Sequence, residues 1–176
     1  MKQLNEEKIN KIRKNPKRYN WKKLCQEYIL SEEFLAEFSS YVDWMTISFH
    51  QGLSENFIYN NRHDLRFYVL FYSQNKISED LINLILKDTT FNTKDWMNLT
   101  FFYKLTENFI LNHMDEIYWD NFFEKRDPLE LSKKFLIDGG AKLRRKFNKY
   151  NYYMILKALN HHGLLKPPEY FNLNNP

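Results

Sequence analysis

Leu30-Ser31-Glu32-Glu33-Phe34-Leu35 is the first of five related six-residue phrases along this chain. The other four begin at Leu53, Ile77, Leu105 and Leu131, so the first residues are 23, 24, 28 and 26 positions apart. A short unit copied at such steps must bury its apolar face against the next copy. The phrase therefore predicts a repeat architecture, and it specifies no chemistry.

Each phrase has the residues that begin a helix, called helix B here. Its second position is Ser or Thr, which are good N-caps, and Glu follows in four of the five copies, where a carboxylate favours the positive helix end. An apolar pair at the fifth and sixth positions starts a stripe along one helix face. Lys133 and Lys134 replace the acids in the fifth copy, so a weaker helix start is expected there.

An aromatic residue upstream of each phrase marks a second short helix, called helix A here. The aromatics stand nine residues before four phrases and twelve before the fifth: Trp21, Trp44, Tyr68, Trp96 and Trp119. Three residues after each aromatic comes an apolar residue, and a step of three is helical: Leu24, Ile47, Phe71, Leu99 and Phe122. The longer fifth unit predicts an insertion near Asp127-Pro128.

The residue just before each aromatic decides whether helix A has its own cap. Asn20, Asp43 and Asp95 are expected to accept a bond from an unpaired helix N–H. Phe67 and Tyr118 occupy this place in the third and fifth units and cannot do so. Stacking should bring each Trp against the phrases of neighbouring units, with core packing as the main role of these Trp and Phe side chains.

Helices are expected on both sides of the five units. One opens at Asn5 and ends before Pro16; a longer one spans 141–161 after Gly139-Gly140, with Gly163 as its C-terminal cap. The predicted fold is all-α, an α-solenoid-like stack of about five short helix-turn-helix repeats with N- and C-terminal capping helices. Its parts are a basic N-terminal capping helix (1–19), an acidic repeat body (20–138) and a basic C-terminal helix and tail (139–176).

Charge is distributed unevenly along the 176 residues. The net charge is +7 over residues 1–23, −9 over 24–138 and +6 over 139–176, which gives +4 for the chain. The one cysteine, Cys25, excludes an internal disulfide and suits a reducing compartment. There is no apolar N-terminal leader and no run of about 20 apolar residues. We therefore expect a cytoplasmic protein, or one of the host cytoplasm if it is viral.

Catalytic and metal-binding motifs are missing from the sequence. The four glycines form no phosphate loop, and His161 and His162 are adjacent and so point to different faces of a helix. Cys25 lies within helix A of the first unit, where a buried apolar role is expected. We expect no enzyme activity, no cofactor and no metal.

Two sets of residues are candidates for binding. The first consists of aromatics that the repeat does not require: Phe49, Tyr72, Phe101, Phe102 and Phe123. Exposed aromatics suit a protein partner, and the acidic body suits a partner with a basic surface. The alternative is that these aromatics thicken the core of irregular units. Phe101 and Phe102 cannot both point inward from one short helix.

The second set is basic and lies beside tyrosines: Lys142, Arg144, Arg145, Lys146 and Lys149. Basic and aromatic side chains together suit nucleic-acid phosphates and bases, whereas a solvated helix face is the alternative reading. Attraction between the basic ends and the acidic body would also permit self-association.

The stretch from Leu30 to Leu35 and on through Val42-Asp43-Trp44 resembles a short helical repeat of bacteriophage and large-DNA-virus proteins, most of them uncharacterised. The resemblance covers roughly residues 20–138 and carries no functional residues. It implies a non-enzymatic protein-binding protein that inhibits or recruits a host protein, for example an anti-CRISPR-type inhibitor of host defence. A nucleic-acid-binding protein that uses the basic terminal helices is the alternative.

Overall fold

The computed structural model describes residues 1–74, 77–146 and 149–165, without the side chains of residues 141, 142, 144–146, 149 and 150. The described chain is mostly helical, which confirms the all-α class. It divides into two compact units, Met1–Asp95 and a second unit that begins at Trp96. This division falls within a helix, and it differs from the three sequence-based parts, whose boundaries follow the repeats and the helices on either side of them.

The first unit contains short helices and one pair of two-residue strands. Its elements are β1 (Lys2–Gln3), α1 (Glu6–Lys14), η1 (Pro16–Arg18), α2 (Trp21–Glu27), β2 (Tyr28–Ile29), α3 (Glu32–Glu37), α4 (Trp44–His50), α5 (Glu55–Asn60), α6 (Phe67–Ser73) and α7 (Glu79–Ile85). β1 pairs in parallel with β2, an element the sequence did not predict. The pairing ties the N-terminal segment to the chain that follows α2.

The helix that contains the division is α8 (Thr93–Phe102). Beyond it come α9 (Glu107–Asn112), α10 (Trp119–Lys125), η2 (Pro128–Glu130), α11 (Lys133–Lys146) and α12 (Lys149–His161). The 3₁₀ turn η2, capped by Asp127, is the insertion predicted at Asp127-Pro128.

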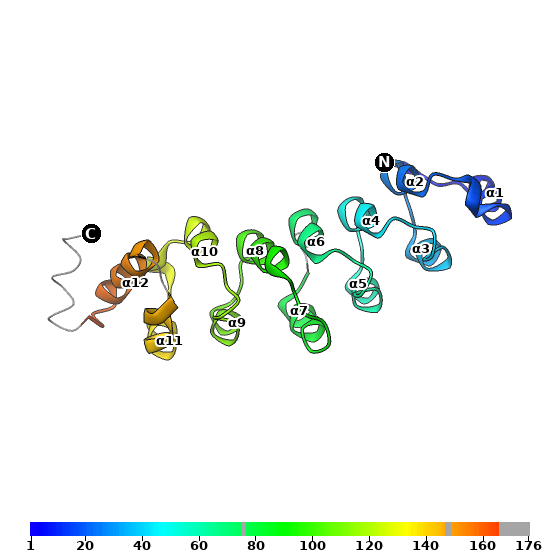
Figure 1. The fold of residues 1–176 in the computed structure, drawn as a ribbon. Helices are drawn as coiled ribbons and strands as arrows, with labels where there is room; N and C mark the ends of the chain where they lie inside the picture. The colour runs from blue at the N-terminus through cyan, green and yellow to red at the C-terminus, as the bar shows by residue number, and fades with distance from the viewer. Residues whose placement is uncertain (75–76, 147–148, 166–176) are drawn as a thin grey trace. The chain divides into compact units, whose positions relative to one another are not determined.

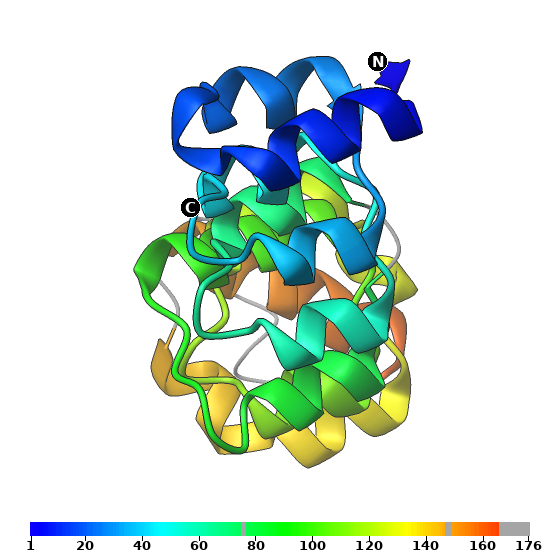
Figure 2. The same cartoon turned by 90° about the vertical axis from the view of Figure 1, so that its right-hand side faces the viewer.

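The helices of the first unit form two layers. Figure 1 shows α2, α4 and α6 on one side and α3, α5 and α7 on the other. In Figure 2, which views this unit from its N-terminal side, the helices of each layer run roughly parallel. The first layer contains the helices predicted as A and the second contains those predicted as B. We call them the A layer and the B layer.

The N-terminus of every described helix B up to α9 is capped as the phrase predicts. The Oγ of Ser31, Ser54 and Ser78 each accepts a bond from the backbone N–H three residues on, at 3.1–3.2 Å, and Thr106 caps α9 in the same way. Ser132 also accepts a bond from the N–H of Phe135, at 3.1 Å, although Lys133 and Lys134 follow it. The weaker signal in the fifth copy therefore still produces a capped helix.

The glutamates of the phrase have a role that the sequence reasoning missed. Glu32 accepts a 2.8 Å bond from the Oγ of Ser54, the cap of the next helix B. Glu55 accepts a 2.6 Å bond from the N–H of Ser78, and Glu107 a 2.6 Å bond from the N–H of Ser132. Each of these carboxylates thus joins its own helix start to the cap of the following copy.

A second set of bonds between copies comes from the residue that ends helix A. The Nε2 of Gln51 donates to the carbonyl oxygens of Cys25 and Tyr28, both at 2.8 Å, and its Oε1 accepts from the N–H of Leu30 at 3.0 Å. Gln74 repeats this contact one copy later, donating to the carbonyl oxygen of Gln51 at 2.8 Å. The loop between helix A and helix B is therefore stabilised by the next copy.

The third unit is out of register with the prediction by one residue. α6 begins at Phe67, which is buried, whereas Tyr68 is half-buried and lies one position further on. Phe67 thus takes the place of the unit aromatic, and Arg66 takes the cap position without making a side-chain cap bond. The expectation that Tyr68 is the unit aromatic and Phe67 the failed cap is wrong, because the third unit has one more residue before its phrase.

Asp95 is not the cap that the sequence suggested. α8 begins at Thr93, and the Oδ1 of Asn92 accepts bonds from the N–H groups of Lys94 and Asp95, at 2.8 and 3.2 Å. The buried Asp95 carboxylate accepts bonds instead from the N–H of Asn92 at 2.8 Å and of Tyr68 at 2.7 Å. It therefore ties α6 to the start of α8.

The unit aromatics lie mainly in the core, as predicted, and Trp21 and Trp44 each contact the Phe of the helix B in their own unit. The Trp21 ring lies 6.0 Å from that of Phe34, and the Trp44 ring 6.3 Å from that of Phe57. Trp21, Trp96 and Trp119 are buried, whereas Trp44 is half-buried. The continuous core is completed by fully buried side chains: Leu35, Ile47, Ile58, Leu70, Phe71, Ile82 and Ile85.

The helix predicted over 141–161 is helical at 141–146, the last part of α11, and again throughout α12, while residues 147–148 lie outside the described residues. Gly140 interrupts α11 with φ +25°, so the glycine pair does end the regular helix of the fifth unit. Gly163, with φ +66°, ends α12 as predicted: its N–H and that of Leu164 donate to the carbonyls of Asn160 and Leu159. These two backbone hydrogen bonds are the pattern expected at a helix C-terminus that ends in glycine.

Candidate protein-binding surface

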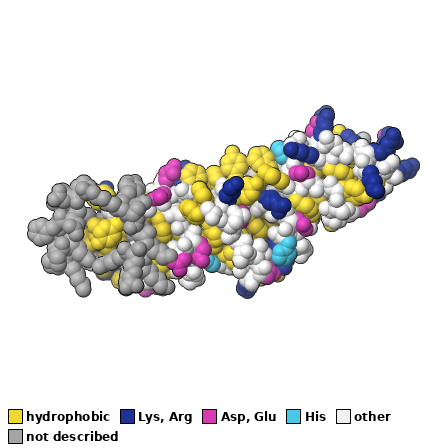
Figure 3. Space-filling model, viewed as in Figure 1, with side chains coloured by type: hydrophobic (Ala, Val, Ile, Leu, Met, Phe, Trp, Pro, Cys, Tyr) yellow, Lys and Arg dark blue, Asp and Glu magenta, His cyan; other side chains and the backbone are white. Residues whose placement is uncertain are grey.

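The outer side of the A layer exposes large apolar side chains. These come from the second and sixth residues of helix A, which lie four apart and therefore on one helix face. In α4 they are Met45 and Phe49, and in α6 they are Tyr68 and Tyr72. We call these four side chains the aromatic surface. Figure 3 shows hydrophobic side chains gathered over α4 and α6 on this side.

Contacts between the two helices order the aromatic surface. The rings of Phe49 and Tyr72 are stacked, with centroids 5.9 Å apart and planes at 25°. The hydroxyl of Tyr68 lies 3.9 Å from the sulfur of Met45. Exposed fractions are 48% for Phe49, 55% for Tyr72 and 52% for Met45. Rings already held in place lose little conformational freedom when a partner covers them.

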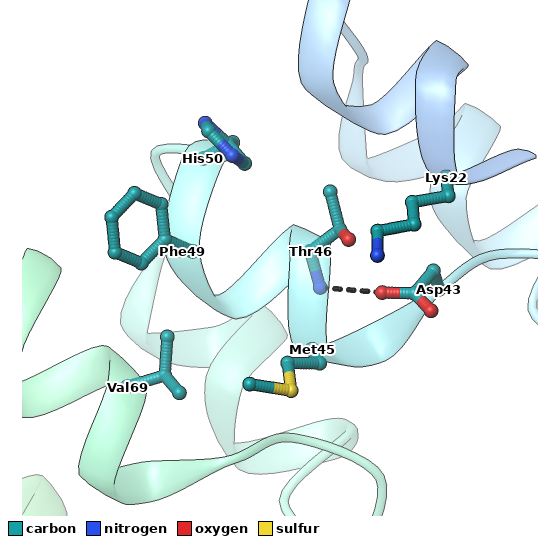
Figure 4. Close-up of a pocket in the computed structure, with 7 residues that line it drawn as sticks. All are labelled: Lys22, Asp43, Met45, Thr46, Phe49, His50 and Val69. Atoms are coloured by element: carbon teal, nitrogen blue, oxygen red, sulfur yellow. Dashed lines mark hydrogen bonds between the residues drawn. The ribbon is translucent and has the colours of Figure 1, made fainter.

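A hollow of about 230 Å³ lies beside this surface. It is lined by residues of α2, α4 and α6 and by the cap of α4: Lys22, Asp43, Met45, Thr46, Phe49, His50 and Val69. In Figure 4, Met45, Phe49 and Val69 lie on one side of the hollow, and Lys22 extends from α2 toward Asp43 on the other. The hollow is apolar on one side and charged on the other.

Asp43 is fixed in this arrangement by the helix that it caps. Its Oδ1 accepts a 2.7 Å bond from the N–H of Thr46. Hydrogen bonding from Thr46 lowers the pKa of Asp43, and the charges of Lys22 and Arg66 lower it further. The carboxylate therefore stays ionised and stays on the helix end.

Charge separates the two layers of the first unit. Helices α3, α5 and α7 of the B layer carry only acidic charged residues: Glu32, Glu33, Glu37, Glu55, Glu79 and Asp80. In the A layer, α4 and α6 carry no Asp, Glu, Lys or Arg, and α2 carries Lys22, Lys23 and Glu27. Within the helices of this unit, the acidic side chains therefore lie mainly in the B layer, away from the aromatic surface.

The five aromatic candidates fall into three groups. Phe49 and Tyr72 belong to the aromatic surface. Phe102 is 39% exposed, whereas Phe101 is half-buried beneath Lys125, whose Nζ lies 4.2 Å from the centroid of the Phe101 ring. Phe101 and Phe102 both line a second hollow, of about 200 Å³, together with Met97, Asn98 and Asn121. Phe123 is 4% exposed and packs on Trp119, so its selection as a binding residue is wrong. It fills the core, as the alternative reading had it.

The side chains of the five basic candidates, Lys142, Arg144, Arg145, Lys146 and Lys149, lie outside the described residues. At the other end of the chain, several cations are engaged within the protein. Arg13 forms a two-pronged ion pair with Glu37, and the Nζ of Lys8 donates to the hydroxyl of Tyr28 at 2.6 Å. Lys14, Lys17 and Arg18 are exposed on α1 and η1.

Met45, Tyr68 and Lys22 were missed by the sequence reasoning. Tyr68 was assigned to the core by the one-residue error in the third unit. With the correct register, the second and sixth residues of helix A read Lys22 and Gln26, Met45 and Phe49, Tyr68 and Tyr72, Met97 and Phe101, Asp120 and Glu124. The middle three copies are apolar or aromatic at both positions and the first and last are polar, a signal visible only in register.

The described part of the chain shows no metal site, no membrane-spanning helix and no reactive cysteine. Its His, Cys, Asp and Glu residues form no group of three able to hold a metal ion. None of its helices has the length and apolar character needed to cross a bilayer. Cys25 is fully buried, as expected, and burial raises the pKa of its thiol, which opposes formation of a nucleophilic thiolate.

No protein-family model, curated protein or solved structure matches the chain. The function of the aromatic surface is therefore inferred from its own geometry and charge.

Proposed function

We propose that this chain is a helical-repeat protein of the solenoid type that acts by binding another protein and not as an enzyme. The observation that carries the proposal is the stacked, half-exposed pair of Phe49 and Tyr72 on α4 and α6. Monomeric proteins seldom leave large ordered apolar side chains together on one face without a partner. Aromatic anchors of this kind dominate binding energy at protein interfaces.

The repeat supports this role physically. The Oγ of Ser73 donates to the carbonyl oxygen of Ser48, and the Nε2 of Gln74 donates to that of Gln51, both at 2.8 Å, so helices α4 and α6 are held at a fixed spacing. A surface made from side chains on rigid helices presents its anchors more accurately than one made on loops. Met45 adds an adaptable side chain at the edge.

Affinity capture from a cell lysate, quantified by mass spectrometry, tests the proposal. Wild type is compared with the Phe49→Ala/Tyr72→Ala double variant and with a matched control, Leu84→Ala, which removes a side chain that is 38% exposed on α7 of the B layer. We expect a protein that wild type and control retain and that the double variant loses by about tenfold or more. Equal retention by all three folded proteins, checked by circular dichroism, would contradict the proposal. Phe102→Ala tests the second hollow in the same assay.

A narrower version is that the bound protein belongs to a host defence, with the chain acting as an anti-CRISPR-type inhibitor. This version is supported by the resemblance of the repeat to phage and viral sequences. Expression of the chain in cells with an active CRISPR system should protect a targeted plasmid, and the Phe49→Ala/Tyr72→Ala variant should not. Unchanged plasmid clearance with wild type would contradict this version only.

The alternative function is nucleic-acid binding through the basic ends. The exposed Lys14, Lys17 and Arg18 support it in the described part. Phosphate contacts predict a steep loss of affinity with salt, and charge reversal at Arg144 and Arg145 should abolish binding. A flat salt titration with a labelled oligonucleotide would reject the alternative.

A further inference from the structure

Cations from three elements border the aromatic surface. Lys22 of α2 lines the hollow beside Met45 and Phe49. Arg66, the residue before α6, acts electrostatically on both Asp43 and Asp95. The Nζ of Lys94 in α8 lies 5.9 Å from the ring centroid of Tyr68. Figure 3 shows Lys and Arg side chains beside the hydrophobic ones on this side.

The neighbouring carboxylates are committed to the backbone. Asp43 accepts the bond from Thr46 that caps α4. Asp95 is 4% exposed and accepts bonds from Tyr68 and Asn92. Asp64, two residues before Arg66, is an exposed acid near this edge. Lys22, Arg66 and Lys94 are all exposed, whereas Asp43 is half-buried and Asp95 is buried, so the exposed charge beside the aromatic surface is mainly positive, in contrast to the acidic helices of the B layer.

The hollow limits the size of the group that enters it. Pockets for small-molecule ligands usually have about 300–1,000 Å³, more than the 230 Å³ available here. One large apolar side chain, held between Met45, Phe49 and Val69, suits this volume. A carboxylate close to that side chain would meet Lys22 at the charged side of the hollow.

We infer that the aromatic surface binds an acidic segment of a partner protein that inserts one large apolar side chain into this hollow. The inference rests on the proposed function and specifies the chemistry of the partner. It departs from the expectation of a basic partner surface, because that expectation followed from the net charge of 24–138 and not from the charges beside the anchors. Complementary charge of this kind selects partners and speeds association.

Selection of a displayed library of random 16-residue peptides on the immobilised full chain tests the inference. Counter-selection uses the Phe49→Ala/Tyr72→Ala variant, and enriched peptides are synthesised with a fluorophore for anisotropy. We expect them to combine Asp or Glu with Leu, Phe or Trp. Lys22→Glu/Arg66→Glu should weaken their binding by about tenfold at low salt and less at high salt. The matched control, Lys87→Glu beyond α7, should leave binding unchanged.

Four outcomes would overturn the inference. Neutral or basic peptides that still need Phe49 and Tyr72 would overturn the acidic partner while leaving the proposed function intact. Peptides that bind the double variant as tightly as wild type would show that binding does not use the aromatic surface, which would contradict both this inference and the proposed function. A library that yields no enriched peptide would contradict the inference that the partner binds through a short segment. Tighter binding of a 20-nucleotide oligo(dT), weakened by Lys22→Glu/Arg66→Glu, would assign the surface to single-stranded nucleic acid instead.

Discussion

Replacing Gln51 by Met tests whether the bonds between copies hold the repeat together. Gln51 is 3% exposed, and its amide makes three hydrogen bonds of 2.8–3.0 Å to the backbone of Cys25, Tyr28 and Leu30. Met has a similar volume and leaves no large cavity. The substitution removes the three bonds and leaves one N–H and two carbonyl groups without their amide partner.

The expected loss follows from the number of bonds. Each is worth about 1 kcal/mol net, which gives about 3 kcal/mol in total, and about 5 kcal/mol if the stranded backbone groups stay dry. Urea denaturation followed by circular dichroism measures the change in unfolding free energy. Hydrogen exchange at the Leu30 amide provides a local measure, because this N–H loses its acceptor.

Gln26→Met is the matched control, since Gln26 is exposed on α2. We expect it to change the unfolding free energy by less than about 0.5 kcal/mol. If Gln51→Met costs less than about 1 kcal/mol and the Leu30 amide keeps its protection, the reasoning about this contact is refuted.

Three further predictions concern single contacts. Ser54→Ala should cost about 1–2 kcal/mol in urea denaturation, and a double-mutant cycle with Glu32→Gln should show coupling of at least about 0.5 kcal/mol; additive effects would deny the bond between copies. Because the pKa of Asp43 is lowered in the folded state, the stability it confers is present above its unfolded pKa, near 3.9, and is lost as pH falls from there through the folded pKa. Asp43→Asn should flatten that acid limb of the stability profile, and an unaltered limb would contradict the assignment. The buried Cys25 thiol, with its raised pKa, should react with a thiol reagent only as the protein opens, so labelling should accelerate in urea; fast labelling of the native protein would contradict its burial.

Local signals in the sequence were sufficient for the B layer. Ser31, Ser54 and Ser78 cap their helices because a side chain reaches the N–H only three residues away. Gly163 ends α12 for an equally local reason, since its positive φ suits glycine. Such features depend on a few neighbouring residues and can be predicted without knowledge of the packing.

Features that depend on distant residues were not predictable in this way. The bonds of Glu32 and Gln51 join residues more than 20 positions apart, and no local pattern distinguishes a bridging glutamate from one that serves its own helix end. The extra residue in the third unit shifted the predicted aromatic from Phe67 to Tyr68 and so concealed the contribution of Tyr68 to the aromatic surface. Phe123 was grouped with Phe49 because both are extra aromatics within helix A, but Phe49 is the sixth residue of its helix and is exposed, whereas Phe123 is the fifth and is buried.

The contacts between copies form in an order set by synthesis of the chain from its N-terminus. The cap of Ser54 is completed by Glu32, which leaves the ribosome earlier, and the loop at Cys25 to Leu30 waits for Gln51, which leaves later. Each new copy thus docks on one already made, while the newest loop keeps unpaired backbone groups until its successor emerges. Nascent chains long enough for residues 28–30, but not Gln51, to clear the exit tunnel should therefore be open to protease in the loop at 28–30. Chains long enough for Gln51 to clear the tunnel as well should be protected there.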